Sequence, residues 1–552
     1  MKALGQFAVA ALLATFVGVM PLSAQGPAGQ SSVVRQALEK IVAQEKQLVE
    51  IFSHYSPRVE TYLQGIHTDK NGKKEIIGDD YFLGRLEVKN GVVERSFLHS
   101  KGISLRGFLG KLPLYGSILP SLSFELQSGS FAEPIFIDPQ HFDLQHYQFE
   151  FVGRQFLGEV RCLVFDVRPR AHAGKGLFEG RVWVEDQGFH IVRFNGAYGR
   201  ENKFSFHFDS WRENLQPGLW LPVYVYSEES SLAKYGVSHL GFRSQTRLWG
   251  YVLKAETPEG QLTRILIESR TPVKDSNSTS QDNSPLASER QWRHEAEVNA
   301  LSRLQKAGLL APPGPVDKVL ETVVNNLVVT NHLDNLPPIH CRVMLTYPLE
   351  SFTVGGTIVL SKGLIDVLPN EASLAMILAH ELAHIVSGDT TDTKYAFFDR
   401  MMVSDDQLLK TFDFAHKKQG EEAVDQEAIK LLENSPYKEK LGEAGLFLEA
   451  LAGMAPRTPD LFASHLGHRL IDMHHQLQMA QLLQGAPKLE PNSIKQIAAL
   501  PLGARIKVNA WNDKVSLMKT KPVNLISAKD KMPFEVTPLF PYLTRYDSKP
   551  GR

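Results

Sequence analysis

The stretch Asn370–Gly388, NEASLAMILAHELAHIVSG, decides the fold of the second half of the chain. Asn370 suits the cap before a helix, and Gly388 suits the position just after one. The apolar residues between them recur at helical spacing and would share one face. They are Leu374, Ile377, Leu378, Leu382 and Ile385. The sequence therefore predicts one largely buried helix over this stretch.

Two histidines on the predicted helix have the spacing of a metal site. His380 and His384 are four residues apart, so their imidazoles would lie one turn apart on the same side and could bind one ion. Glu381 would lie beside them, where a carboxylate can take a proton from water. The alternative is a surface helix with two ordinary histidines. A helix so rich in Ala and Leu would then hide two imidazoles and a carboxylate without a reason, which disfavours that alternative.

A catalytic zinc needs a third protein ligand, which the motif itself does not supply. The residues after His384 lack the HxxGxxH continuation that would provide a third histidine. A second predicted helix opens at Gly420 and carries Glu421 and Asp425 on one face, four residues apart. One carboxylate can bind metal while the other holds a ligand histidine by its free N–H. The alternative is an acidic helix start favoured by the helix dipole, which accounts for Glu422.

This combination of motifs resembles the gluzincin peptidases that include the CAAX prenyl protease and the bacterial membrane heat-shock protease. The residues concerned are HELAH at 380–384, followed by Glu421, Asp425 and Ala428, within a similarity that covers about 295–480. The layout is nearest to the soluble periplasmic branch of the family, which acts in quality control of outer-membrane proteins. The resemblance implies one zinc ion per chain, held by His380, His384 and Glu421. It also implies Glu381 as general base and Asp425 as a carboxylate that supports a ligand.

Two flanking segments extend the resemblance. Ser351–Leu364 is similar to the family's edge strand, and Ser464–Leu470 is similar to its Ser/Thr-His-Pro segment, with Leu466 in place of Pro. The second segment implies His465 and Arg469 as catalytic contacts to the oxyanion or the substrate. The transmembrane helices of the prenyl and heat-shock members have no counterpart in this sequence, which predicts a mature chain without a transmembrane segment.

The first 24 residues have the features of a secretory signal. Lys2 is followed by an apolar run at 7–20, and Ala24 is a suitable residue before a cleavage site. An uncleaved membrane anchor is the alternative, but the run is shorter than the roughly 20 residues that span a bilayer. We therefore expect a periplasmic or secreted protein, cleaved near Ala24.

The part that follows is predicted to be rich in strands. A helix is expected within 32–66, and from about 60 to 270 short alternating runs such as Tyr147–Phe151 and Phe204–Phe208 are separated by turn residues. Phe151–Val167 and Phe178–Glu185 resemble the outer-membrane lipoprotein carrier fold, a curved sheet closed by a helix around an apolar cavity. That resemblance implies lipid or lipoprotein as a possible partner. The alternative is an ordinary sheet core, because alternation is what any half-buried strand shows.

Length and charge limit the remaining possibilities. The chain has 552 residues, with 60 Lys and Arg against 61 Asp and Glu. This balance supplies no field to attract nucleic acid. Cys162 and Cys341 are far apart in the sequence and are expected to be buried and free, not metal ligands.

The predicted fold class is multidomain α+β, with a curved antiparallel β-sheet domain before a mainly helical zincin-type peptidase domain with a short edge sheet. The predicted parts are a signal peptide at 1–24, a helix and curved sheet at 32–270, a linker at 271–292, the peptidase domain at 293–484 and a strand and turn extension at 485–552.

The predicted function is an exported zinc metalloendopeptidase. Its substrates would be unfolded or misassembled envelope proteins, whose backbone would add as a strand at Gly355–Ser361. One alternative is a periplasmic chaperone or a lipid- or lipoprotein-binding module in which the zinc site is little used. Another is a scaffold whose structural zinc has four protein ligands and no water.

Overall fold

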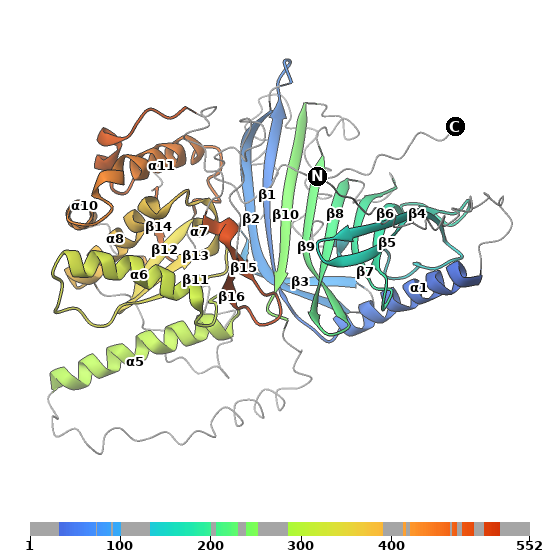
Figure 1. Cartoon of the computed structure of the whole chain (residues 1–552), viewed down its shortest axis with the longest axis horizontal. Coiled ribbons are helices and arrows are strands. Elements are labelled where there is room, and N and C mark those ends of the chain that lie inside the picture. Colours follow the sequence, from blue (N-terminus) through green and yellow to red (C-terminus); the bar gives the residue numbers. More distant parts are fainter. Residues whose placement is uncertain are drawn as a thin grey trace, which may run out of the picture.

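The computed structural model describes most of the chain between residues 32 and 518. The described ranges are 32–72, 74–89, 92–100, 133–199, 206–229, 239–251, 285–389, 412–415, 420–463, 466–471, 477–490 and 502–518. The predicted signal peptide at 1–24 and the first fourteen residues of the predicted linker lie outside these ranges. A strand-rich part and a helical part lie side by side (Figure 1). The predicted α+β fold class is confirmed.

The strand-rich part is a single antiparallel sheet of ten strands in the described residues. Its order is β3-β2-β1-β10-β9-β8-β7-β6-β5-β4, so that β1 and β10, far apart in the sequence, pair as the third and fourth strands of the sheet. The strands are β1 (Arg58–Thr68), β2 (Lys74–Lys89), β3 (Val92–Ser100), β4 (Tyr147–Leu157), β5 (Val160–Pro169), β6 (Phe178–Glu185), β7 (Ile191–Tyr198), β8 (His207–Gln216), β9 (Leu219–Glu229) and β10 (Leu240–Trp249).

Helix α1 (Ser32–Phe52) packs against this sheet and supplies part of its core (Figure 1). Its buried residues Leu38, Ile41 and Phe52 follow helical spacing, and they pack in one cluster with aromatic residues of the strands. The predicted helix within 32–66 is therefore real but ends at Phe52, and β1 begins at Arg58. Cys162 lies on β5 and Cys341 on β11 (His340–Met344), and both are buried and free as expected.

The helical part surrounds a four-stranded sheet with the order β11-β13-β12-β14. Its other strands are β12 (Glu350–Val354), β13 (Thr357–Ser361) and β14 (His468–Arg469). The helices are α5 (Pro285–Lys306), α6 (Pro315–Thr330), α7 (Lys362–Val367), α8 (Glu371–Ser387), α10 (Glu421–Glu433) and α11 (Leu441–Met454). The short 3-10 turns are η2 (Glu133–Ile135), η5 (Lys438–Lys440), η6 (Ala480–Gly485) and η7 (Leu502–Arg505). A small hairpin of β15 (Ile506–Val508) and β16 (Val515–Leu517) lies near the junction of the two parts (Figure 1).

The structure corrects two expectations. The predicted linker at 271–292 ends earlier, because α5 begins at Pro285, a residue that suits the first turn of a helix. Side-chain pairs four residues apart, such as Arg293 with Glu289 at 3.2 Å, support this polar helix. The predicted strand addition at Gly355–Ser361 is also wrong for β13, because β13 pairs with β11 on one side and β12 on the other.

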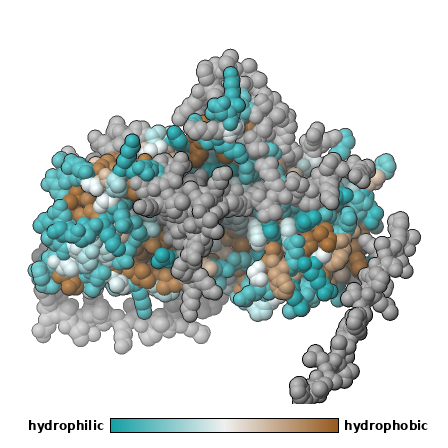
Figure 2. All heavy atoms as spheres, turned by 45° about the horizontal axis from the view of Figure 1, so that its top comes forward, coloured by the Kyte–Doolittle hydropathy of each residue, from teal (hydrophilic) through white to brown (hydrophobic). Residues whose placement is uncertain are grey.

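Among the described residues, the hydrophobic side chains do not gather on one face in the view of Figure 2. Hydrophobic side chains form separate patches over both parts, divided by hydrophilic ones. Among the described residues, no helix combines the length and the apolar character needed to cross a membrane.

Candidate functional site

Helix α8 carries the two motif histidines, and its sequence explains its ends. The side chain of Asn370 accepts a hydrogen bond from the backbone N–H of Ser373 at 2.9 Å, which caps the start. Gly388 has a φ of 73°, the left-handed conformation that ends many helices. Every residue from Ala372 to His384 is buried. The helix thus holds its histidines in a rigid interior position.

His380 and His384 face each other across one turn of α8. Their Nε2 atoms are 3.2 Å apart and their rings are nearly perpendicular, with an interplanar angle of 84°. Two nitrogens that share one tetrahedral zinc, at about 2.0 to 2.1 Å each, lie roughly 3.4 Å apart. The observed separation therefore fits two ligands of one ion.

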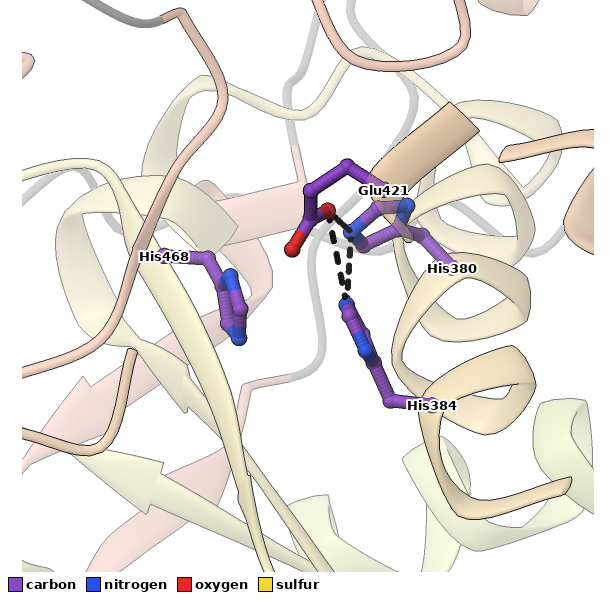
Figure 3. A group of neighbouring side chains, drawn as sticks. All are labelled: His380, His384, Glu421 and His468. Atoms are coloured by element: carbon purple, nitrogen blue, oxygen red, sulfur yellow. Dashed lines mark hydrogen bonds and ion pairs between the residues drawn. The ribbon is translucent and has the colours of Figure 1, made fainter. Parts of the chain in front are cut away.

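Glu421 comes from the first turn of α10 and points at both imidazoles (Figure 3). Its Oε2 lies 3.8 Å from Nε2 of His380 and 3.8 Å from Nε2 of His384. This buried oxygen accepts no hydrogen bond from any described residue. A buried carboxylate oxygen that faces two imidazole nitrogens and accepts no hydrogen bond fits the position of a third metal ligand.

Glu381 is fully buried beside the histidines and is held on one side by β12. Ser351 donates a hydrogen bond from Oγ to Oε1 of Glu381 at 2.6 Å. Oε2 has no hydrogen-bond partner among the described residues. Burial raises the pKa of Glu381 to about 7, against the lowering effects of His380 and Ser351. A carboxyl with such a pKa can accept and release a proton near neutral pH.

Each motif histidine has a carboxylate at its other ring nitrogen. Asp425, on α10, places Oδ1 3.1 Å from Nδ1 of His380, and its Oδ2 accepts the backbone N–H of Met479 at 2.7 Å. Asp389 places Oδ2 2.8 Å from Nδ1 of His384. Such carboxylates fix the tautomer of a metal-binding histidine and leave Nε2 unprotonated for the ion.

Burial and charge act in opposite directions on these groups. Burial by itself lowers the pKa of His380, but Asp425, Glu381 and Glu421 outweigh it, and the net shift is upward. Burial raises the pKa of Glu421. Several carboxylates enclosed with two imidazoles are therefore best balanced by a bound cation.

His468, on β14, approaches the site from the side opposite α8 (Figure 3). Its ring stacks on that of His384, with centroids 4.7 Å apart and an interplanar angle of 23°. The ligand atoms of His380, His384, Glu421 and His468 all lie within 4.8 Å of one another. His468 is thus a fourth residue able to reach a metal ion.

The structure brings five of the seven predicted site residues together, and the side chains of the other two are not described. His380, His384, Glu381, Glu421 and Asp425 are brought together, and the roles assigned to them stay predictions. His465 lies outside the described residues. The backbone of Arg469 pairs with Glu350 of β12, and its side chain is not described. Sequence reasoning missed Ser351, Asp389 and His468.

A helix with HExxH whose two histidines face a glutamate on a second helix defines a site of the metallopeptidase kind. Residues 317–441 match the family model described as Peptidase family M48. This part of the chain is therefore similar to the M48 metallopeptidases, and the resemblance to a zinc metallopeptidase family predicted from the sequence is confirmed. Members of this family depend on a metal ion, and the cluster around His380 has suitable ligands.

Twenty-three chains among the solved structures are similar to this chain, and three of them are as follows. A DUF1329 family protein from Desulfovibrio piger is 12% identical, with 40% of this chain and 95% of that chain covered and a TM-score of 0.23. A LolA superfamily protein from Nitrosomonas europaea is 13% identical, with 41% and 94% covered and a TM-score of 0.19. A putative outer membrane lipoprotein-sorting protein domain from Vibrio parahaemolyticus is 11% identical, with 42% and 99% covered and a TM-score of 0.21. No curated protein matches this chain.

Proposed function

We propose that this protein is an exported zinc-dependent endopeptidase that cleaves unfolded or misassembled envelope proteins. One observation carries the proposal: His380, His384 and Glu421 converge on one point next to the buried carboxylate of Glu381. Two imidazoles and one glutamate are the ligand set of many catalytic zinc sites. A zinc ion bound there supplies Lewis acidity, which polarises a carbonyl and lowers the pKa of water.

Glu381 is the residue that moves the proton in this proposal. Ser351 holds its Oε1, so Oε2 remains to take a proton from the attacking water and to pass it to the leaving amine. Asp425 and Asp389 keep the Nδ1 protons of the two histidines in place. The pKa of about 7 suits Glu381 to both halves of this transfer.

The substrate backbone is placed alongside β12 in our proposal. β12 passes Glu381 at Ser351, and β14 pairs only with Glu350 and Ser351 of this strand. Among the described residues, Phe352–Val354 therefore have no paired strand on the side away from β13, and an extended substrate could add there. A substrate read through its backbone must be extended, which favours unfolded segments over folded ones. The predicted signal at 1–24 puts such substrates in the envelope, and binding of lipid or lipoprotein by the sheet stays a prediction.

Digestion of an unfolded protein tests the proposal directly. The mature chain should contain one zinc ion by elemental mass spectrometry and should degrade casein. Removal of the metal with a chelator should stop cleavage, and added zinc should restore it. Cleavage at an unchanged rate by metal-free protein would refute the proposed chemistry.

His468 favours a second candidate, a structural zinc with four protein ligands. In that case zinc would raise the thermal stability of the chain without any cleavage of casein. His468→Ala would then lower the zinc affinity and still yield no activity. The proposed peptidase, in contrast, needs an open fourth position on the zinc ion. It therefore predicts that His468→Ala still cleaves casein.

A further inference from the structure

Two buried carboxylates of the ten-stranded sheet reach into the peptidase part. Glu60 lies on β1 and Asp79 on β2, and both are buried. Neither belongs to the metal cluster or carries a role in the proposed reaction. Their partners in the peptidase part are backbone N–H groups of two segments that lead to the site.

Glu60 holds the segment that precedes β12. Its Oε1 accepts the backbone N–H of Tyr347 at 2.7 Å and the hydroxyl of Tyr81 at 2.7 Å. Its Oε2 accepts a hydrogen bond from Nη2 of Arg247 at 2.5 Å, and the same Nη2 also donates a hydrogen bond to the carbonyl of Leu345 at 2.6 Å. The Arg247 guanidinium also lies 3.7 Å from the centre of the Tyr347 ring. A buried ion pair of the sheet therefore fixes residues 345–347.

Asp79 holds a second segment of the peptidase part. Its Oδ1 accepts the backbone N–H of Asp460 at 3.0 Å, and its Oδ2 accepts that of Leu461 at 2.8 Å. The hydroxyl of Tyr62 donates to Oδ2 at 3.1 Å. Three donors on one buried carboxylate form a strong and directional attachment.

The two held segments join at the start of β12. The backbone N–H of Leu349 donates to the carbonyl of Leu461 at 2.8 Å. The next residue, Glu350, accepts the backbone N–H groups of Leu466 and Gly467 at 3.0 and 3.1 Å. These contacts lead without a gap from Asp79 to the residue before His468.

The same start of β12 also sets the position of Glu381. Ser351, which donates to Glu381, pairs in the β12–β14 ladder with His468. The two segments held by Glu60 and Asp79 therefore lead to two side chains of the site. Ser351 lies against the carboxylate of Glu381, and His468 lies against the imidazole of His384.

We propose that Glu60 and Asp79 of the β-sheet domain are positioning residues of the peptidase site, which set Ser351 and His468 through the start of β12. The proposal rests on the proposed peptidase function. In this proposal the ten-stranded sheet helps to order the peptidase site, in addition to any binding role of its own. It requires that the site loosens when either attachment is cut, even though both lie in the other part of the chain.

Amide substitutions cut each attachment with little change of shape. Asp79→Asn replaces one acceptor oxygen by an NH2 group, which would face a backbone N–H. Glu60→Gln does the same at Tyr347 or at Arg247. Tyr62→Phe removes only one donor to Asp79, and it serves as the milder variant should Asp79→Asn fail to fold.

The matched control is Glu45→Gln in the same part of the chain. Glu45, on α1, is as deeply buried and pairs with Arg212 at 2.6 and 2.7 Å, but its contacts stay within the β-sheet domain.

The experiment has two readouts on the full mature chain. Hydrogen exchange of metal-free protein follows the peptides that cover 349–354 and 461–471, and casein digestion by zinc-loaded protein gives kcat and KM. For Asp79→Asn and Glu60→Gln we expect exchange at least tenfold faster in both peptides and kcat about tenfold lower with KM unchanged. The Glu45→Gln control should keep wild-type values in both readouts.

The outcomes separate this proposal from the proposed function. Wild-type exchange in these peptides, or a change no larger than in Glu45→Gln, would overturn the positioning role whatever the activity. Faster exchange with an unchanged kcat would also overturn it. A wild-type protein that binds zinc and cleaves nothing would refute the proposed function, and the exchange readout would still decide whether the sheet orders the site.

Discussion

Asp425→Asn tests whether the carboxylate of Asp425 sets the tautomer in which His380 can bind a metal ion. In the native chain the carboxylate of Asp425 lies 3.1 Å from Nδ1 of His380 and accepts the N–H of Met479 through its other oxygen. The asparagine can keep the bond to Met479, but its NH2 group then faces Nδ1. His380 would have to accept there, which puts its proton on Nε2, the atom that faces His384 and Glu421.

The expected loss follows from that change of tautomer. Carboxylates that orient metal-binding histidines contribute about 10- to 100-fold to metal affinity, or about 1.4 to 2.7 kcal/mol. The upper half of this range is expected, because the side chain of Asp425 is only 21% exposed. Asp389→Asn should cost less, since its side chain is 39% exposed and more open to water.

A competition titration with a chromophoric zinc chelator measures this loss. Metal-free protein is titrated at neutral pH, and circular dichroism checks that each variant is folded. Glu422→Gln, on the same helix turn but outside the metal cluster, is the matched control and should bind zinc like the wild type. An unchanged zinc dissociation constant in Asp425→Asn would refute the reasoning.

Three further predictions follow from the structure. Ser351→Ala should lower kcat about tenfold at unchanged zinc content, because a hydrogen bond to a charged group contributes about 1.5 to 3 kcal/mol; equal rates would show that Glu381 needs no such support. His468→Ala should weaken zinc binding yet keep casein cleavage at or above the wild-type rate, and a complete loss of cleavage would mean that His468 takes part in the reaction. Burial and two neighbouring aspartates raise the pKa of Asp80 to about 8. Below about pH 4 the folded and the unfolded chain both carry this proton, whereas between about pH 4 and 8 only the folded chain does. The free energy of unfolding therefore falls as the pH rises, and the contribution of the proton is gone above about pH 8. The melting temperature should therefore fall from pH 5 to pH 9, less so in Asp80→Asn, and parallel curves for the two proteins would contradict this assignment.

The parts of the site that follow local rules could be predicted from the sequence. Helical spacing places His380, Glu381 and His384, because it fixes which side chains share a face. The same rule placed Glu421 and Asp425 on one turn of α10. Capping residues gave both ends of α8, and period-two alternation gave the strands of the large sheet.

The parts that were missed depend on contacts distant in sequence. Nothing local distinguishes His468 from His465, and only the pairing of β14 with β12 brings His468 to the metal cluster. The edge position predicted for Gly355–Ser361 was wrong for the same reason. The side of β13 away from β12 is covered by β11, which comes earlier in the sequence than β12. Asp389 offered a weak signal. A helix that ends at a left-handed glycine turns the chain back, and the N–H of Asp389 bonds to the carbonyl of His384 at 3.1 Å.

The rate of casein cleavage by zinc-loaded Glu381→Gln tests the central claim most directly. The glutamine keeps the size of the side chain and an oxygen for Ser351, but it cannot take a proton from water. We predict full zinc binding, an unchanged melting temperature and a loss of cleavage of at least 100-fold. Cleavage at the wild-type rate with zinc bound would contradict the account.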